Sequence, residues 1–249
     1  MRFEDKVVLV TGGGTGIGRA AAIAFAGEGA AVLVTGPDEE PLRQTVKEIE
    51  THGGTAGYLV GDMTDESDVR AAVDAAVHRH GGLDVAFNNA GIMVPGPLAD
   101  LDPETWAKGL SVATMTWLSM KHEIAHMRAH GGGVIVNMSS IIGTRRTIPG
   151  TGAYGAAKAA ISSITRTAAL ENIGAGVRIN SVSPGPVATP FSLIRGETED
   201  EQAARMRSAL PIGRVGSLDE VVGTVLWLAS EDSGFAVGTE VVIDGGATA

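Results

Sequence analysis

Short apolar runs alternate along the chain with longer segments in which apolar residues recur at helical spacing. Residues 7–10 are four consecutive apolar residues that stop just before a glycine cluster, which is typical of a buried parallel strand. Residues 17–28 are alanine-rich with apolar faces and are closed by Gly29, which indicates a helix. Repetition of this pair predicts strands at 7–10, 31–35, 57–60, 83–87, 134–138, 177–182 and 240–243, and helices at 17–28, 39–50, 66–80, 103–130, 154–171 and 219–230.

The alternation of strands and helices determines the expected fold class. A strand, a helix and the next parallel strand form a βαβ unit with a right-handed crossover. Repeated units give a doubly wound, mostly parallel sheet with helices on both faces. No proline- or serine-rich linker, charge block or solenoid repeat divides the chain. We therefore expect an α/β fold in which residues 1–249 form a single domain.

Residues 190–213 interrupt this alternation directly after a strand end. Loops at the carboxyl ends of parallel strands are where open α/β sheets bind ligands, so we interpret the segment as a substrate lid. A solvated helical excursion is the alternative, and the sequence favours neither. The segment is rich in charged residues: Arg195, Glu197, Glu199, Asp200 and Glu201.

The composition excludes several functional classes. The 249 residues include 29 acidic and 19 basic side chains, a formal net charge of −10, with no dense Lys/Arg block. This balance argues against nucleic acid or an anionic membrane surface as the main partner. The absence of cysteine excludes disulfides, thiolate metal sites and a cysteine nucleophile.

The start of the chain has no targeting pattern. Glu4 and Asp5 stand where a signal peptide has a basic start and a long apolar stretch. No apolar run approaches the ~18 residues that a membrane span needs. We therefore expect a cytoplasmic enzyme with no membrane partner.

A glycine-rich turn, Thr11-Gly12-Gly13-Gly14-Thr15-Gly16-Ile17-Gly18, joins the first predicted strand to the first helix. Glycines permit positive φ and close approach of the backbone to a pyrophosphate, at which the N–H groups of the helix start point. The spacing differs from the G-x-G-x-x-G pattern, and a simple tight turn is the alternative. Its place after an N-terminal buried strand favours a dinucleotide. The expected contacts are Gly12, Gly14, Thr15, Gly16, Ile17 and Gly18.

Three later segments follow predicted strands and therefore lie at the same sheet edge as the glycine-rich turn. Asp62-Met63 is placed to meet an adenine, while Asn88–Gly91 and residues 184–189 follow the fourth and sixth strands. Each segment alone is consistent with an ordinary turn, but their shared location favours a ligand site. The expected cofactor-binding residues are Asp62, Met63, Asn89, Ala90, Gly91, Pro184, Gly185, Val187 and Thr189.

Tyr154 and Lys158 are four residues apart on a predicted helix and so share one face. A phenol with a pKa near ~10 is a poor base at neutral pH. A nearby ammonium favours the phenolate, so we expect Lys158 to lower the pKa of Tyr154. The alternative is an ordinary tyrosine and lysine on an amphipathic helix.

Together, Thr11–Gly18, Asn88–Gly91, Tyr154-x3-Lys158 and Pro184-Gly185 resemble the short-chain dehydrogenase/reductase family in its short single-domain branch. The resemblance extends nearly to the end of the chain, at Asp244-Gly245-Gly246. It implies a Rossmann-type sheet that binds NAD(H) or NADP(H), oxidation of alcohols or reduction of ketones, and assembly as a homotetramer.

The resemblance also implies roles for individual residues. Tyr154 transfers the hydroxyl proton while hydride passes to or from the nicotinamide, and Lys158 holds the nicotinamide ribose. Ser140, in the strand-end sequence Val136-Asn137-Met138-Ser139-Ser140, orients the substrate oxygen, with Ser139 as the alternative. The spacing from Ser140 to Tyr154 is one residue longer than the usual family pattern, and Arg145-Arg146 lies within that longer loop.

One departure from the family pattern affects the expected activity. The family usually has an asparagine in the helix after Trp106, where this chain has Ser111-Val112-Ala113. In the family this asparagine supports a water that relays protons. Its position falls on Val112 or Ala113 in this chain, so Ser111 is the nearby side chain that can hold such a water. A dinucleotide-binding protein with weak or no catalysis is therefore an alternative, and a lyase or epimerase that uses bound NAD internally fits less well.

The cofactor is expected to be NAD(H), with NADP(H)-dependent ketone reduction as the alternative. A 2′-phosphate requires Arg or Lys after the second strand, whereas a free 2′-hydroxyl requires a carboxylate. Here the sequence is Gly36-Pro37-Asp38-Glu39-Glu40, and the family's basic positions match Pro37 or Thr15. The family's usual acidic position matches Gly36, which has no side-chain acceptor, so Asp38, about 20 residues past Gly18, is the expected ribose ligand.

Other features change this interpretation little. His122, His126 and His130 share a helical stripe without a carboxylate, so we expect no metal. Arg145 and Arg146 are either solvated loop charges, which we favour, or ligands of an anionic substrate group. The expected function is hydride transfer between NAD(H) and a secondary alcohol or ketone. The expected selectivity residues are Met93, Val94, Ile141, Ile142 and the segment 190–213.

Overall fold

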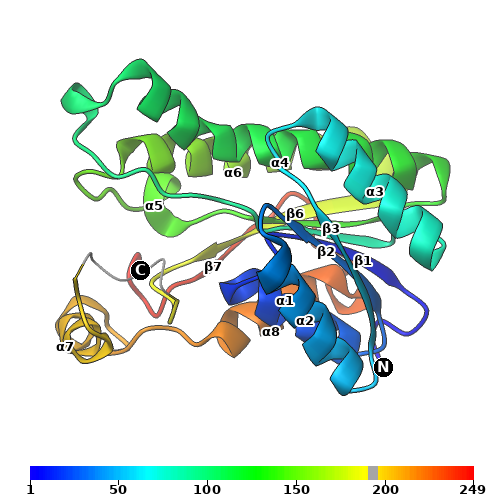
Figure 1. Ribbon diagram of the computed structural model, residues 1–249. Helices are drawn as coiled ribbons and strands as arrows, with labels where there is room; N and C mark the ends of the chain where they lie inside the picture. Colours follow the sequence, from blue (N-terminus) through cyan, green and yellow to red (C-terminus); the bar gives the residue numbers. More distant parts are fainter. Residues whose placement is uncertain (190–195) are drawn as a thin grey trace.

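The computed structural model describes residues 1–189 and 196–249. These residues form one sheet of seven strands in the order β3-β2-β1-β4-β5-β6-β7 (Figure 1). Every pairing between neighbouring strands is parallel. The strands are β1 (Val7–Thr11), β2 (Ala31–Gly36), β3 (Thr55–Val60), β4 (Val85–Asn88), β5 (Gly133–Met138), β6 (Val177–Pro184) and β7 (Glu240–Ile243).

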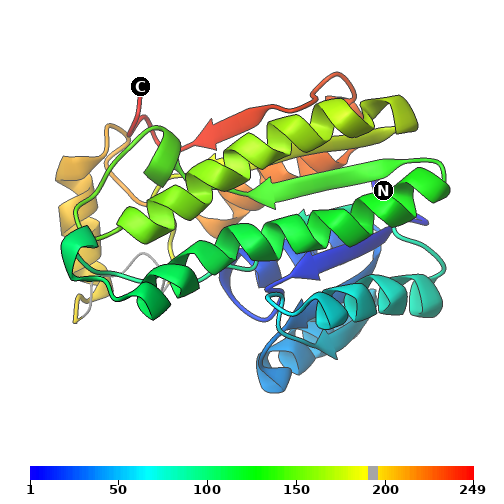
Figure 2. The ribbon, with the colours of Figure 1, turned by 90° about the horizontal axis from the view of Figure 1, so that it is seen from above.

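Helices cover both faces of the sheet, and Figure 2 shows α4 and α6 side by side across one of them. That face carries α3 (Glu66–His80), α4 (Pro103–Ala129) and α6 (Gly152–Asn172), and the other carries α1 (Gly16–Gly27), α2 (Glu39–Thr51) and α8 (Leu218–Ala229). The predicted doubly wound fold is confirmed, and the ends of the predicted elements lie within two residues of those observed. Shorter elements that the pattern did not separate are η1 (Leu98–Asp100), α5 (Ile141–Thr144), η2 (Ile173–Ala175), α7 (Glu199–Ala209) and η4 (Glu231–Ser233).

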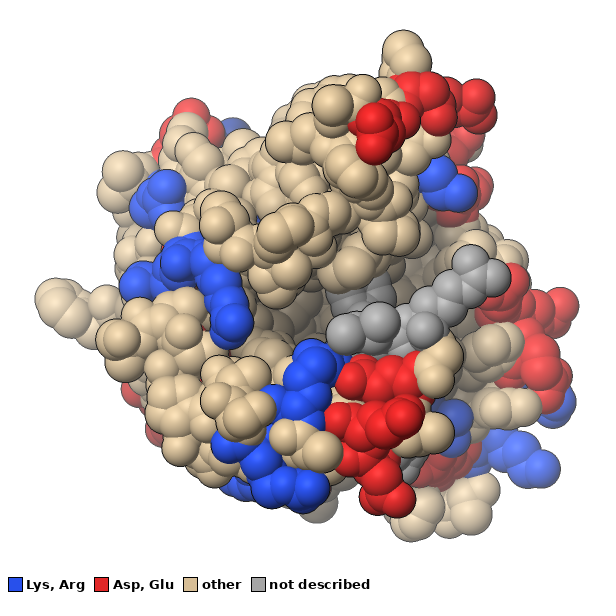
Figure 3. Space-filling view, turned by 90° about the vertical axis from the view of Figure 1, so that its left-hand side faces the viewer, with Lys and Arg blue, Asp and Glu red and all other residues tan. Residues whose placement is uncertain are grey.

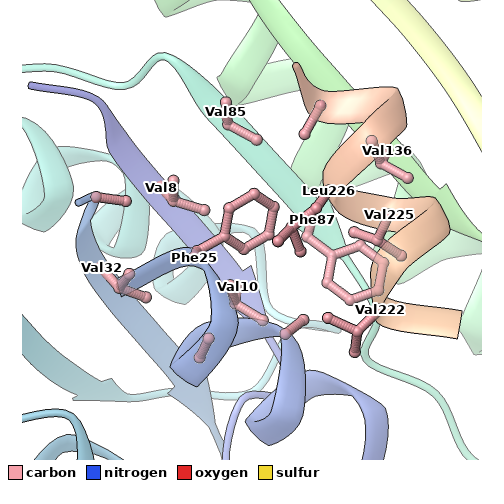
Figure 4. Packing of buried hydrophobic residues seen from close by; sticks show 14 of the residues in the cluster. Val8, Val10, Phe25, Val32, Val85, Phe87, Val136, Val222, Val225 and Leu226 are labelled. Carbon is pink, nitrogen blue, oxygen red and sulfur yellow. The ribbon is translucent and has the colours of Figure 1, made fainter. Parts of the chain in front are cut away.

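The large hydrophobic clusters on the two faces of the sheet explain why β1 is apolar at successive positions. Side chains alternate between the two faces of a strand, so Val8 and Val10 pack with Phe25 and Phe87 beneath α1 and α8 (Figure 4). Leu9, like Val7, belongs to the cluster beneath α4 and α6. A central strand buried on both faces therefore needs apolar residues along its length.

The segment 190–213 is only partly described, because residues 190–195 lie outside the described residues. Its second half contains α7, which begins with a capping box in which Thr198 and Glu201 satisfy each other's backbone N–H groups. Met206 and Leu210 are buried, so this helix is not wholly solvated. Whether the segment acts as a lid remains a prediction.

No helix among residues 1–189 and 196–249 is both long enough and apolar enough to cross a membrane.

Candidate active site

A cavity of about 1510 Å³ runs along the carboxyl ends of the central strands. Its lining comes from the turns that follow β1 through β6 and from α4 and α6. β1 and β4 are neighbours where the strand order reverses, which is the usual ligand crevice of an open α/β sheet. Figure 3 looks onto this side of the molecule, whose surface is hollowed near the centre. The volume exceeds the ~300–1,000 Å³ of most single-ligand pockets, so a dinucleotide and a small substrate fit together.

The glycine-rich turn closes tightly over the end of β1. Gly12 has a φ of +66° and donates its N–H to the Thr35 carbonyl at 2.7 Å, while Gly16 has a φ of +53°. A Cβ at Gly18 would collide with the Gly12 carbonyl oxygen, so only glycine lets α1 start this close to the turn. The cap residue Thr15 forms no side-chain cap bond, which leaves the first N–H groups of α1 for an anion.

The turn after β4 holds the glycine-rich turn in place. The Thr11 hydroxyl accepts hydrogen bonds from the backbone N–H groups of Asn89 and Ala90, both at 3.1 Å. The Asn89 amide in return donates to the carbonyls of Thr11 and Gly12, both at 3.3 Å. Gly91 follows in the cavity wall. The two turns that the sequence linked by location are thus directly bonded.

Asp38, Asp62 and Met63 lie at the end of the cavity bordered by β2 and β3. The exposed Asp38 carboxylate precedes α2 without capping it, and it forms no hydrogen bond or ion pair with any residue that the structure describes. The Asp62 carboxylate accepts bonds from the Thr64 N–H and hydroxyl, both at 2.8 Å, and Met63 is buried. Both oxygens of the Asp38 carboxylate are therefore left open by the described residues.

The turn after β6 approaches the glycine-rich turn from the opposite side. A Cβ at Gly185 would lie 2.8 Å from the Asp244 Cα, so glycine is required where the two segments cross. A Cβ at Gly16 would lie 3.7 Å from the Thr189 Cγ2, which places Thr189 next to the start of α1. Of all the predicted cofactor-binding residues, Gly18 alone does not line the cavity, because it is buried against Gly12.

Ser140, Tyr154 and Lys158 lie together in the same cavity. Tyr154 is 6% exposed and Lys158 is 3% exposed, so both are shielded from bulk water. The Ser140 and Tyr154 side chains share a hydrogen bond, and Lys158 Nζ donates to the Met138 carbonyl at 2.6 Å. The Lys158 Nζ also lies 5.6 Å from the centroid of the Tyr154 ring. The i, i+4 spacing on α6 and the end of β5 thus bring the three side chains into one group.

The two neighbouring serines at the end of β5 have different environments. The Ser139 hydroxyl points into the protein, where it donates to the Lys158 carbonyl at 3.0 Å and is 2.7 Å from the Ser162 hydroxyl. Ser140 instead begins the turn α5, and its hydroxyl accepts from the Ile142 N–H at 3.1 Å. Ser139 therefore joins α6 to β5, and Ser140 is the serine that meets Tyr154.

Burial shifts the pKa values of both Tyr154 and Lys158 toward their neutral forms. It raises the pKa of Tyr154 to about 12, against a smaller lowering by the bond with Ser140. It lowers the pKa of Lys158 to about 7. The expected lowering of the Tyr154 pKa by Lys158 is therefore not found in this structure, because loss of hydration outweighs the hydrogen bond with Ser140 and Lys158 is not among the causes of the shift.

The chain matches, over residues 12–248, the family described as enoyl-(acyl carrier protein) reductase. It is 37% identical over 249 residues to the cyclohexanol dehydrogenase of Acinetobacter sp. (strain SE19), with 99% of this chain and 96% of that protein covered. It is 39% identical over 249 residues to the cis-4-hydroxycyclohexanecarboxylate dehydrogenase of Sinomonas cyclohexanicum, with 99% and 98% covered. The crystal structure of levodione reductase has a TM-score of 0.93 to this chain at 33% identity and covers 99% of both.

The chain belongs to the short-chain dehydrogenase/reductase family. The resemblance seen in the sequence is thereby confirmed. Members of this family are oxidoreductases that generally use NAD(H) or NADP(H). The glycine-rich turn, with its positive-φ glycines and uncapped helix start, fits the pyrophosphate of either dinucleotide.

One position departs from the usual short-chain dehydrogenase/reductase pattern. Val112, one of the two candidates for the asparagine position, is fully buried and packs with Ala157 and Ile161. A Cβ at Gly91 would lie 3.5 Å from its Cγ1, so Val112 stands directly behind the cavity wall. Ser111 lines the cavity, but its hydroxyl donates to the Lys108 carbonyl at 2.8 Å. An apolar side chain thus replaces the amide beneath the site.

The far end of the cavity has apolar walls and a charged mouth. Met93, Ile141 and Ile142 line it as the sequence suggested, whereas Val94 does not. Sequence reasoning missed Lys108 and Arg205, which also line the cavity, because each is one of many charges on an amphipathic helix.

The histidine stripe has no metal-binding arrangement. The His126 and His130 rings stack at 4.1 Å between centroids, and His122 lies 3.1 Å from a Glu66 oxygen. In the described part of the chain, no group of three or more His, Asp or Glu side chains is placed to bind a metal ion.

Proposed function

We propose that this short-chain dehydrogenase/reductase transfers hydride between NAD(H) and a secondary alcohol or ketone carried on a ring. The observation that carries the proposal is that the Tyr154 hydroxyl, bonded to Ser140, lies buried in the same cavity as the glycine-rich turn. A proton donor is thus placed where a carbonyl carbon can approach a bound nicotinamide. Bound nicotinamide supplies or accepts the hydride.

Ser140, Tyr154 and Lys158 have separate proposed roles in the reaction. A ketone oxygen accepts hydrogen bonds from the Ser140 and Tyr154 hydroxyls, which polarise the carbonyl. Because the pKa of Tyr154 is about 12, its phenol is protonated at neutral pH and is ready to donate to the oxygen as it gains negative charge. Lys158, bonded to the Met138 carbonyl, is held within the site and is proposed to bind the nicotinamide ribose.

The choice of NAD(H) over NADP(H) rests on the charges at the end of β2. The open Asp38 carboxylate can accept hydrogen bonds from ribose hydroxyls and repels a 2′-phosphate. The nearby Arg43 bonds to Glu40 at 2.6–2.9 Å. The cations among the described residues that line the cavity are Lys108, Arg146, Lys158 and Arg205, which belong to its other end.

The ring-alcohol class is supported by the relatives and by the apolar wall. Two similar proteins are dehydrogenases of cyclohexanol and of cis-4-hydroxycyclohexanecarboxylate. Met93, Ile141 and Ile142 give the substrate end a surface suited to a saturated ring. Apolar contacts discriminate weakly between similar molecules, so they favour a class of substrates.

The direct test measures cyclohexanone reduction by NADH in the wild type and in Tyr154→Phe. We expect kcat to fall about 10²- to 10⁴-fold, with NADH affinity within about threefold of the wild type. The other tyrosine of the chain, Tyr58, bonds to Glu39 on the surface and provides a matched control, so Tyr58→Phe should keep full activity. Unchanged turnover in Tyr154→Phe would refute the assigned role.

Val112 motivates a second candidate function, a nucleotide-binding protein with weak catalysis. An apolar side chain at the asparagine position supports no water relay beneath Lys158. Tight NADH binding without turnover of any alcohol or ketone would favour this candidate. Restored turnover in Val112→Asn would show that Ser140, Tyr154 and Lys158 support the reaction and that the wild type lacks only the water relay.

We also propose that the protein is a cytoplasmic homotetramer and that segment 190–213 is a lid. Several large apolar side chains on α4, α6 and α8 are exposed, as expected for faces that meet other subunits. They include Trp117 (52% exposed), Leu170 (76%) and Trp227 (39%). Light scattering on the purified protein tests the tetramer, since a monomeric mass contradicts it.

A further inference from the structure

The loop that carries the extra residue between Ser140 and Tyr154 is a compact turn. The Gly143 N–H donates to the Arg146 carbonyl at 3.0 Å, and the Arg146 N–H donates to the Ile141 carbonyl at 2.8 Å. Ile142 and Arg146 are paired as an isolated parallel bridge. Gly143 has a φ of +120°, and a Cβ there would collide with the Gly155 carbonyl oxygen, so the turn packs directly on α6. The backbone of Arg146 is thus held in a defined place.

The turn gives its two arginines different environments. Arg145 is exposed and does not line the cavity, whereas Arg146 is half-buried and does line it. The Arg146 guanidinium forms no hydrogen bond or ion pair with any residue that the structure describes. A half-buried guanidinium loses hydration and, without a partner, gains nothing in return. The favoured sequence interpretation, two equivalent solvated charges, therefore applies to Arg145 alone.

The neighbouring charges leave one positive charge in excess at this end of the cavity. Arg205 is already neutralised by a two-point ion pair with Glu197, at 2.6 and 2.7 Å. Lys108 and Glu104 also line the cavity and carry opposite charges. Lys158 is bonded to the Met138 carbonyl and is assigned to the cofactor ribose, which leaves the charge of Arg146 for the substrate. This occurs in a chain with a net charge of −10, and Lys and Arg side chains border the hollow in Figure 3. A single local positive charge is complementary to a monoanion.

We infer that Arg146 binds a carboxylate on the substrate, so that the preferred substrate is a ring ketone or alcohol bearing a carboxylate. A guanidinium presents two parallel N–H groups that match the two oxygens of a carboxylate. Arg146 is bridged to Ile142, whose N–H bonds to Ser140, so the backbone that carries the guanidinium is tied to the residue that carries the carbonyl-binding hydroxyl, and both residues line the same cavity.

The inference rests on the proposed ketone reductase activity, and its test separates the two. The probes are 4-oxocyclohexanecarboxylate and its uncharged carboxamide, with NADH, in the wild type, Arg146→Ala, Arg146→Lys and Arg145→Ala. We expect the wild type to prefer the acid by at least about tenfold in kcat/KM. Arg146→Ala should raise KM for the acid about 10- to 100-fold, with kcat and the amide kinetics within about twofold.

The control variants separate charge from structure. Arg146→Lys keeps the charge but loses the two-point geometry, so it should recover part of the acid preference, while Arg145→Ala should retain all of it. Added salt should weaken the acid preference of the wild type and leave the amide unchanged. Equal kcat/KM for acid and amide in the wild type, or equal losses for both in Arg146→Ala, would overturn the inference.

A binding measurement distinguishes failure of this inference from failure of the proposed function. Cyclohexanecarboxylate and cyclohexanecarboxamide are titrated into the NADH-loaded enzyme by calorimetry. Carboxylate binding that is lost in Arg146→Ala supports the inference even if no ketone is reduced. Ketone reduction together with equal or undetectable binding of both probes overturns the inference and leaves the reductase activity standing.

Discussion

The two ends of the cavity are built in different ways. At the nucleotide end, the shape comes from backbone: Gly12 and Gly16 at positive φ, and Gly18 packed against the Gly12 carbonyl. At the substrate end, the shape comes from side chains: Met93, Ile141 and Ile142 form apolar walls, and the ionisable Tyr154 and Lys158 are only 6% and 3% exposed.

The two ends therefore affect the stability of the folded protein differently. A site shaped by backbone requires glycine wherever a Cβ would collide with a neighbouring atom, and it buries no ionisable group. The substrate end instead keeps ionisable groups away from water, which opposes folding. Substitutions at the first end should therefore damage binding, and some at the second should raise stability.

At the nucleotide end, the largest expected effect on binding is at Gly18. In Gly18→Ala the new Cβ meets the Gly12 carbonyl oxygen and lies 2.6 Å from the Asn89 amide nitrogen, so α1 or the glycine-rich turn must move. A displacement of about 1 Å at a site of this kind reduces rates about 100-fold, and we expect a loss of that order in NADH affinity. Gly27→Ala in the same helix has open space around the new Cβ and should leave binding intact. Calorimetric titration of both variants with NADH checks the pair.

Lys158→Met should abolish turnover and yet stabilise the folded protein. Burial lowers the pKa of Lys158 from 10.5 to about 7, so the folded state disfavours the charged form that the unfolded chain retains. The penalty is full below pH 7, shrinks as the pH rises toward 10.5 and then vanishes. We expect a gain in unfolding free energy on the order of 3 kcal/mol at or below neutral pH. Urea unfolding across this pH range measures it, with the exposed Lys47→Met as the control; a gain independent of pH contradicts the mechanism.

Glu123→Gln should produce the opposite pH dependence. The Glu123 carboxyl accepts from the Asn88 amide at 2.9 Å, its other oxygen has no partner in the described residues, and burial raises its pKa from 4.5 to about 8. The wild type should lose stability as the pH rises from 4.5 to 8, because the unfolded chain ionises first. The variant should be more stable above pH 8, by on the order of 2–3 kcal/mol, and equal below pH 4.5. Thermal unfolding at several pH values decides this, and the exposed Glu171→Gln should behave like the wild type.

The smallest expected effect is at Asp38, whose carboxylate has no partner among the described residues. Asp38→Ala should lower kcat/KM for NADH by about tenfold, because a hydrogen bond from a ribose hydroxyl to a charged group is lost, and should raise kcat/KM for NADPH, because the repulsion of the 2′-phosphate is removed. Kinetics with both cofactors test this. A wild-type preference of tenfold or more for NADPH would contradict the role of Asp38 altogether.

Local sequence patterns were sufficient for the elements and for much of the site. Continuous apolar runs predicted the strands, because a strand buried on both faces has no polar position. The pair Tyr154 and Lys158 followed from helical spacing, and the glycine-rich turn followed from its place after β1. Short elements such as α5 escaped prediction because four residues are too few to show a period.

Other features of the site depend on segments that are distant in the sequence. Ser139 and Ser140 are adjacent and have the same side chain, so the sequence does not distinguish them. The packing of β5 against α6 directs the Ser139 hydroxyl to Ser162 and the Ser140 hydroxyl to Tyr154. In the same way, the turn that packs on α6 brings Arg146 into the cavity lining and leaves Arg145 exposed.

Neighbours within one element thus fix which segments fold as strands and helices and where the glycine-rich turn lies, so these could be read from the amino-acid sequence. The tertiary structure alone decided which hydroxyl meets the phenol, which guanidinium faces the cavity and which charges are buried. Burial and orientation arise from contacts between elements, and a pKa such as that of Lys158 follows from the surroundings that those contacts create.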